Sequence, residues 1–172
     1  GFDLAAETEQ VFGAPPLVFK AALSGETAGA INFWHFLAKM KAAGMRELIS
    51  VETAATSLGL NPDIPLLGYV LKESYLKENP GMAKALYGAS RSAKDLLASD
   101  DSAWEVLRPR MNAKSDAQFE TLRRDFRAGI PGPGNVDEDG AATFFALMAS
   151  LGGEKLVGSA KDLPSGLFVD LE

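Results

Sequence analysis

The stretch SGETAGAINFWHFLAKMKAAGMRELISV, residues 24–51, decides the fold that the sequence predicts. Small and apolar residues at 28–33 favour a short strand, and the segment after them has the apolar spacing of a helix. Residues 45–51 then favour a second strand. Because a further helix is expected before this stretch, the order helix, strand, helix, strand predicts a parallel sheet with crossover helices.

Proline, glycine and asparagine mark the ends of the first two predicted helices. Pro15 and Pro16 suit a helix start, and Gly25 suits the end of that helix. Asn32 stands at the N-cap position of the next helix, and Gly44 is placed for its C-terminal turn. The first of these helices is therefore expected to be short.

A third strand is predicted at 64–74, where apolar residues occupy both alternating faces, as in a strand covered on both sides. The second half of the chain is expected to be mostly helical. Its helix starts are expected at Asn79–Pro80, at the capping boxes Ser102–Glu105 and Ser115–Gln118, and at the acidic residues 137–139, with Gly152 and Gly153 closing the last helix.

The amino-acid composition and net charge exclude some classes of function and partner. The chain has 172 residues, 47% of them hydrophobic, which is enough for a core in one domain or one large piece of a protein. A net charge of -6 disfavours nucleic acid and anionic membrane surfaces as partners. The chain has no cysteine, which excludes disulfides, thiolate metal sites and cysteine nucleophiles.

The candidate ligand-binding residues lie where the first predicted strand meets its helix. Asn32 and Trp34 would stand at the carboxyl end of that strand, where open α/β sheets bind ligands and where a helix offers free N–H groups. A purely structural interpretation stays open for each residue. His35, the only histidine in the sequence, would be an ordinary packed residue, Asn32 a helix cap, and Trp34 a residue of the core.

The sequence motifs do not support a catalytic site or a metal site. There is no G-x-S-x-G elbow, and one histidine without cysteine cannot complete a zinc site. NVDEDG, residues 135–140, matches half of a calcium-binding EF-hand loop, but Ala146 stands where a bidentate glutamate is required. An acidic helix start explains this segment better.

Two long stretches, 13–44 and 58–109, resemble the later part of substrate-binding proteins of nitrate, sulfonate and taurine ABC importers. Gly25 and Glu26 match the opening of a family strand, and residues 32–34 match its aromatic end. The Gly68–Tyr69 strand and the Asn79–Pro80 helix start also fit. Ala28–Gly29 departs from the family pattern, which has Asp-Ala there.

The resemblance implies a type II periplasmic binding protein fold, of class α/β, with the sheet units followed by a largely helical C-terminal half. Residues 1–66 would be the end of the second lobe, and 67–172 the return strand and helical part of the first. Asn32, Trp34, His35 and Tyr69 would face an interlobe cleft. The implied partners are a small-molecule ligand, the ABC permease and an N-terminal portion of the same protein that would precede this sequence.

The function implied is periplasmic capture of a small molecule and its delivery to the permease, without enzymatic activity, cofactor or metal. One alternative is a periplasmic accessory protein of the same type that docks to another protein; an apolar groove without polar anchors would favour it. The other is an enzyme like the thiamine-pyrimidine synthases, which rely on a cysteine-rich motif that this chain does not have.

Overall fold

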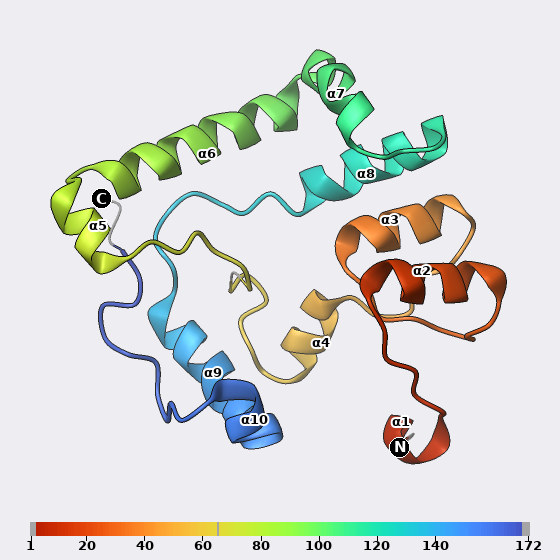
Figure 1. Cartoon of the computed structure of the whole chain (residues 1–172), viewed down its shortest axis with the longest axis horizontal. Coiled ribbons are helices and arrows are strands. Elements are labelled where there is room, and N and C mark those ends of the chain that lie inside the picture. The colour runs from red at the N-terminus through yellow and green to blue at the C-terminus, as the bar shows by residue number, and fades with distance from the viewer. Residues whose placement is uncertain (1–2, 65, 170–172) are drawn as a thin grey trace. The chain divides into compact units, whose positions relative to one another are not determined.

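The computed structural model describes residues 3–64 and 66–169, and within these ranges it contains helices and no strand (Figure 1). The predicted α/β class, with a parallel sheet in a type II periplasmic binding protein fold, is therefore wrong. The predicted strand at 28–33 is irregular, residues 45–50 are also irregular, and the described part of 64–74 forms bends, extended chain and the start of a helix. The largely helical second half is confirmed.

The predicted strands do not form because a strand needs a neighbouring strand to pair with. An apolar pattern permits a strand, but a strand forms only where a neighbour takes its N–H and C=O groups. Ile31 is 95% exposed, Leu48 79% and Val70 93%, so these side chains of the three predicted strands have no neighbouring strand or helix to cover them within the described chain. Local pattern alone was not sufficient to predict a sheet.

The chain divides into two compact units. Unit 1 comprises Gly1–Glu47 and Asp101–Gly129, and unit 2 comprises Leu48–Asp100 and Ile130–Glu172. Each unit therefore combines two separate segments of the sequence. The predicted lobes, 1–66 and 67–172, refer to a larger receptor and stay a prediction.

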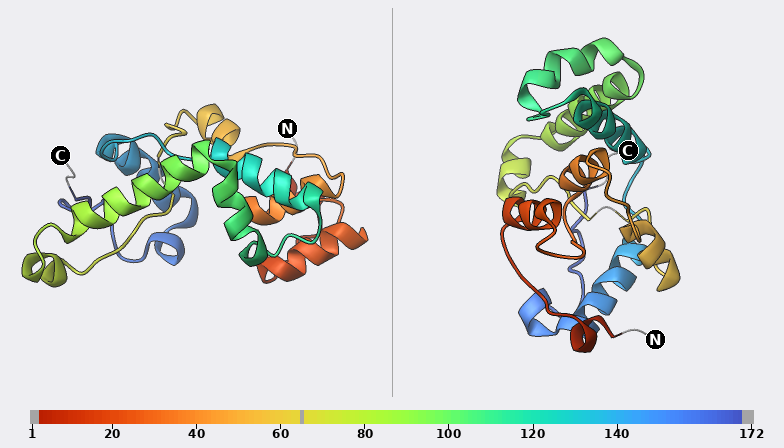
Figure 2. Two further views of the ribbon diagram at one scale, coloured as in Figure 1. Left: turned by 90° about the horizontal axis from the view of Figure 1, so that it is seen from above. Right: turned by 90° about the vertical axis from the view of Figure 1, so that its right-hand side faces the viewer.

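Unit 1 is built around the packing of α3, Trp34–Ala42, against α8, Asp116–Ala128 (Figures 1 and 2). α2, Pro15–Ser24, packs on α3. The unit also contains α1, Leu4–Glu7, α7, Asp101–Leu107, and a 3-10 turn, Arg108–Arg110. Its best-buried side chains are those of Ala38, Met40, Trp104, Phe119 and Leu122.

Polar contacts join the same helices. Lys41 Nζ lies 2.6 Å from a carboxylate oxygen of Asp125, which links α3 to α8. Lys39 Nζ donates to the carbonyl oxygen of Asn112 at 3.1 Å, which ties α3 to the loop before α8. Apolar packing and these ties together fix the direction of α3.

Several predicted helix ends in unit 1 are confirmed. Gly25 ends α2 in the left-handed conformation, with φ of 76°, which a residue with a Cβ adopts only at a cost. The side chain of Ser115 caps α8 by accepting from the N–H of Gln118. Two predictions are wrong: Phe33, not Asn32, is the N-cap of α3, and α7 begins at Asp101, so Ser102 does not cap it.

Unit 2 contains α4, Val51–Ser57, α5, Glu73–Glu78, α6, Met82–Ser99, α9, Glu138–Gly152, and α10, Glu154–Val157. α10 packs back on α9. Asp137 caps α9 through the N–H of Gly140, and Gly153 ends it, as predicted. The predicted start of α6 at Asn79–Pro80 is wrong, because Gly81 is its N-cap.

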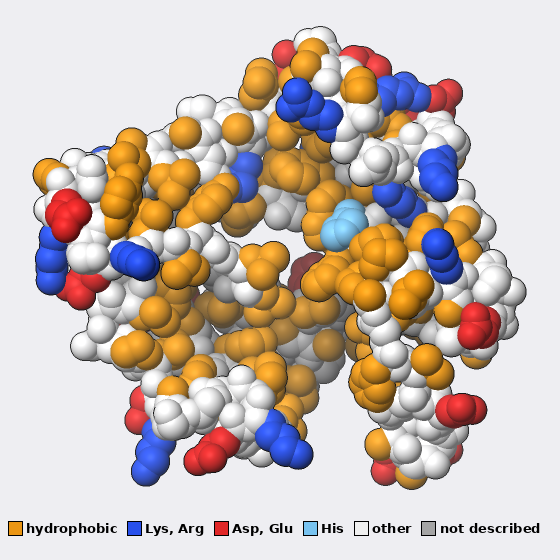
Figure 3. Space-filling model, in the orientation of Figure 1, with side chains coloured by type: hydrophobic (Ala, Val, Ile, Leu, Met, Phe, Trp, Pro, Cys, Tyr) orange, Lys and Arg blue, Asp and Glu red, His pale blue; other side chains and the backbone are white. Residues whose placement is uncertain are grey.

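The core of unit 2 is small. Among its described residues only Ala55, Leu60 and Ala141 are buried, and none belongs to α6. Hydrophobic side chains are correspondingly widespread on the face drawn in Figure 3. Polar bonds supplement the core, as between Asn61 and Asp137 at 2.9 Å and between Arg91 and the carbonyl oxygen of Pro131 at 2.7 Å.

None of the helices in the described ranges is both long enough and apolar enough to cross a bilayer.

Candidate functional site

Asn32 acts as a structural tie at the start of α3. Its side-chain Nδ2 donates to the carbonyl oxygen of Pro15 at 3.0 Å, and its Oδ1 accepts from the N–H of Phe33 at 2.9 Å. Both ends of the amide therefore have protein partners. This geometry anchors the turn before α3 on the first residue of α2.

Trp34 and His35 belong to a cluster of aromatic rings. The Trp34 indole is 48% exposed and lies 6.0 Å from the Phe126 ring of α8, centroid to centroid. The His35 ring stacks on Phe33 at 6.0 Å and tilts against Phe36 at 4.6 Å. Burial in this cluster, and then the charge of Lys39, lower the pKa of His35 below its usual value, which favours the neutral imidazole.

The start of α3 retains some features of the predicted ligand site. No side chain caps α3, so its first N–H groups are free of a cap, and the Phe33 and Trp34 rings beside them are 60% and 48% exposed. The structure thus brings Asn32, Trp34 and His35 together. Tyr69 belongs to unit 2, where its hydroxyl pairs with Ser90 Oγ at 3.1 Å.

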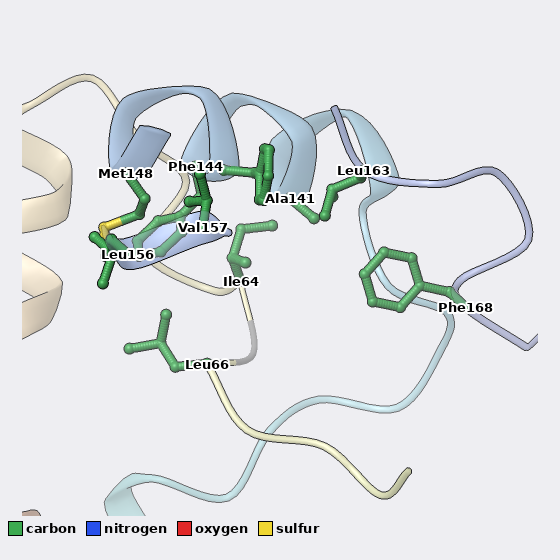
Figure 4. A pocket seen from close by; sticks show the side chains of 10 residues that line it. Ile64, Leu66, Ala141, Phe144, Met148, Leu156, Val157, Leu163 and Phe168 are labelled. Atoms are coloured by element: carbon green, nitrogen blue, oxygen red, sulfur yellow. The ribbon is translucent and has the colours of Figure 1, made fainter. Parts of the chain in front are cut away.

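One hollow of unit 2, called the apolar hollow below, has a volume of about 470 Å³. Figure 4 shows side chains reaching it from α9, from α10, from the segment around Ile64 and from the C-terminal segment. Every lining residue is apolar. They are Ile64, Leu66, Ala141, Phe144, Phe145, Met148, Leu156, Val157, Leu163 and Phe168.

The sequence of α9 explains most of this wall. Ala141, Phe144, Phe145 and Met148 recur at helical spacing and therefore share one face. Gly140 lets the segment around Ile64 approach closely, since a Cβ at Gly140 would lie 2.7 Å from Ile64 Cδ1. The close approach places Ile64 opposite the aromatic residues of α9.

The chain turns back after α9 and supplies the rest of the wall. Gly153 ends α9 with a positive φ of 55° and is followed at once by α10. This turn brings Leu156 and Val157 beside the aromatic face of α9 (Figure 4). The hollow is therefore built from segments that are close in sequence except for Ile64 and Leu66.

A smaller hollow of about 170 Å³, called the acidic hollow below, is lined by Asn135, Val136, Glu138, Phe168 and Val169. Phe168 belongs to the linings of both hollows. Among the described residues of the two linings, only Glu138, in the first turn of α9, is ionisable. It forms no ion pair with any residue of the described ranges.

Sequence reasoning missed both hollows. The helix that begins at residues 137–139 was expected, but no hollow beside it was, and residues 64–74 were taken as a strand. The available signal was a helix face with two adjacent phenylalanines and a methionine, closed by two glycines. Residues 3–64 and 66–169 contain no group of three or more histidine, aspartate or glutamate side chains placed to hold a metal ion.

No protein-family model matches the chain, and no curated protein matches it either.

Proposed function

We propose that this protein is a noncatalytic binding protein, the substrate-binding component of an ABC importer, and that it captures a small molecule by apolar contacts. The observation that carries the binding role is the apolar hollow of about 470 Å³ in unit 2. This volume falls within the roughly 300–1,000 Å³ typical of small-molecule sites, which are lined mainly by apolar and aromatic side chains.

The importer role rests on the sequence resemblance of residues 13–44 and 58–109. It supports the proposal of a periplasmic location and of two protein partners, the permease and an N-terminal portion of the same receptor. No bond-making step belongs to the proposal. A ligand would act only by binding one conformation of the receptor more tightly than another.

Binding would be driven by burial of apolar ligand surface against α9 and α10. Each square ångström of apolar surface removed from water contributes about 25 cal/mol. Phe144, Phe145 and Met148 are the largest side chains that α9 contributes to the wall. The flexible, polarisable Met148 suits a wall that accepts ligands of more than one shape.

A thermal-shift panel of small anions, pyrimidines, aromatic acids and metal chelates, with neutral alkyl compounds added, tests the proposal. A true ligand at 100 times its dissociation constant stabilises the folded state by about 2.7 kcal/mol. Phe144→Ala removes a wall of the hollow and is expected to weaken binding about tenfold. Leu151→Ala is the matched control, because Leu151 lies on the same helix, is 73% exposed and does not line the hollow.

The same panel locates the site. If Trp34→Ala abolishes the response while Phe144→Ala preserves it, the ligand binds at the start of α3, and the assignment to the hollow is wrong. If no compound stabilises the protein, or if Phe144→Ala and Leu151→Ala respond alike, binding in the hollow is refuted.

A second candidate is the accessory protein that docks to another periplasmic protein. The observation that favours it is the lining of the apolar hollow, which has no charged side chain to anchor a polar nutrient. This candidate expects no stabilisation by any small compound. It also expects a purified importer component to bind the wild-type chain more tightly than Phe144→Ala, as measured by calorimetry.

A further inference from the structure

The two hollows of unit 2 differ in chemical character. The apolar hollow offers about 470 Å³ without a charged group, and the acidic hollow adds about 170 Å³ beside the carboxylate of Glu138. Phe168 belongs to both linings. A ligand that occupies both would therefore have an apolar body and a polar end.

The polar end would experience a negative potential. The described segment 130–169 has five acidic residues, Asp137, Glu138, Asp139, Glu154 and Asp162, against the two basic residues Lys155 and Lys161. No lysine or arginine is among the described residues that line the two hollows. Within this segment, carboxylates therefore outnumber basic side chains, and Glu138 is the charged side chain described at the acidic hollow.

The helix dipole opposes this potential but does not cancel it. The N-terminus of a helix is equivalent to roughly half a positive charge. Three consecutive carboxylates, at residues 137–139, stand at the start of α9. Asp137 is engaged with the N–H of Gly140 and with Asn61, whereas Glu138 forms no ion pair among the described residues. The net local charge stays negative, which suits a cation.

We propose that the two hollows together bind a cationic amphiphile, with its alkyl or aryl body in the apolar hollow and its ammonium group beside Glu138. This inference rests on the proposed function, since it names the ligand class of the same site. It commits to a small molecule, because the volume of the hollows matches a ligand rather than a polypeptide surface.

Three ligands with the same eight-carbon chain test the proposal: octylammonium, octanol and octanoate. Titration calorimetry on the full chain, below the concentration at which each compound aggregates, gives the three dissociation constants. Octylammonium is expected to bind about fivefold more tightly than octanol, which is the gain of one partly exposed charge pair. Octanoate is expected to bind more weakly than octanol because its carboxylate meets Glu138.

The variant Glu138→Gln removes the negative charge of this side chain and keeps its size. This variant should bring the dissociation constant of octylammonium to that of octanol and leave octanol unchanged. Asp139→Asn is the matched control, since Asp139 lies in the same turn of α9 and lines neither hollow. Asp139→Asn should keep most of the preference for octylammonium. Circular dichroism of both variants checks that they fold.

The outcomes separate the two proposals. If octanol does not bind, or binds Phe144→Ala equally well, the hollow is no ligand site, and both the proposed function and this inference fail. If octanol binds but octylammonium binds no more tightly, only the cationic preference fails. Equal losses of octylammonium affinity in Glu138→Gln and Asp139→Asn would also overturn the assignment of Glu138.

Discussion

Truncation of Phe119 is the most direct test of how unit 1 is held together. Phe119 lies on α8, is 0% exposed, and has the Arg108 guanidinium 4.4 Å from its ring centroid. Phe119→Ala removes the buried ring and leaves a cavity, which together cost about 3–5 kcal/mol. Loss of the cation–π contact with Arg108 adds up to about 1 kcal/mol at a partly exposed site.

Urea unfolding followed by tryptophan fluorescence measures this change. Both tryptophans of the chain, Trp34 and Trp104, belong to unit 1, so their emission reports on that unit. Small domains are stable by about 5–15 kcal/mol, so Phe119→Ala should lower the urea midpoint by about 2 M or unfold the unit outright. Phe12→Ala, at a side chain that is 88% exposed, is the control and should change the midpoint little. Equal midpoints for the two variants would refute the role of buried Phe119 in holding unit 1 together.

Three further predictions concern unit 1. Burial lowers the pKa of His35 in the folded state below its unfolded value of about 6.5. The packing of the neutral imidazole therefore contributes its full stability above about pH 6.5, and this contribution is lost as the pH falls from that value through the folded-state pKa. Urea midpoints should therefore drop from about pH 7 to about pH 5 in the wild type and less in His35→Asn; equal drops would contradict the assignment. Gly25→Ala forces a Cβ into a backbone with φ of 76° and should cost about 1 kcal/mol of unfolding free energy, so an unchanged midpoint would argue against a left-handed cap. Ser115→Ala removes the acceptor for the Gln118 N–H at 3.2 Å and should cost about 1 kcal/mol, with a helix content by circular dichroism that falls before the global transition.

Sequence reasoning succeeded where a few neighbouring residues decide the structure. The ends of helices at Gly25, Ser115, Asp137 and Gly153 were predicted and are confirmed. Each depends on one side chain and the two or three N–H or C=O groups beside it, or on one glycine with positive φ. Such signals are contained within four residues and do not need knowledge of the rest of the chain.

Sequence reasoning failed where residues distant in the sequence decide the local structure. Asn32 had the chemistry of a helix cap, but its amide is used between Pro15 and Phe33, seventeen residues and one residue away. Asn79 had the same chemistry and instead follows α5, with Gly81 at the start of α6. A polar side chain near a helix start has several possible partners, and tertiary packing chooses among them.

The candidate site shows the same division between local and distant information. The aromatic face of α9 and its closing glycines could be recognised from the sequence, because helical spacing is local. The hollow could not, because it also requires Ile64 and Leu66, about eighty residues earlier, to lie against that face. Gly140 is the residue that permits this approach, and nothing in its immediate sequence indicates the position of Ile64.

The composition of the two units connects binding to stability. Unit 1 buries Trp104, Phe119 and Leu122, whereas the large side chains of α9 in unit 2 line an open hollow and only Ala55, Leu60 and Ala141 of its described residues are buried. A ligand in the hollow would cover apolar surface that the protein itself leaves in contact with water. Its binding free energy would then appear as stability of unit 2. Because unit 1 has its own core, occupancy should raise the stability of one unit and leave the other unchanged.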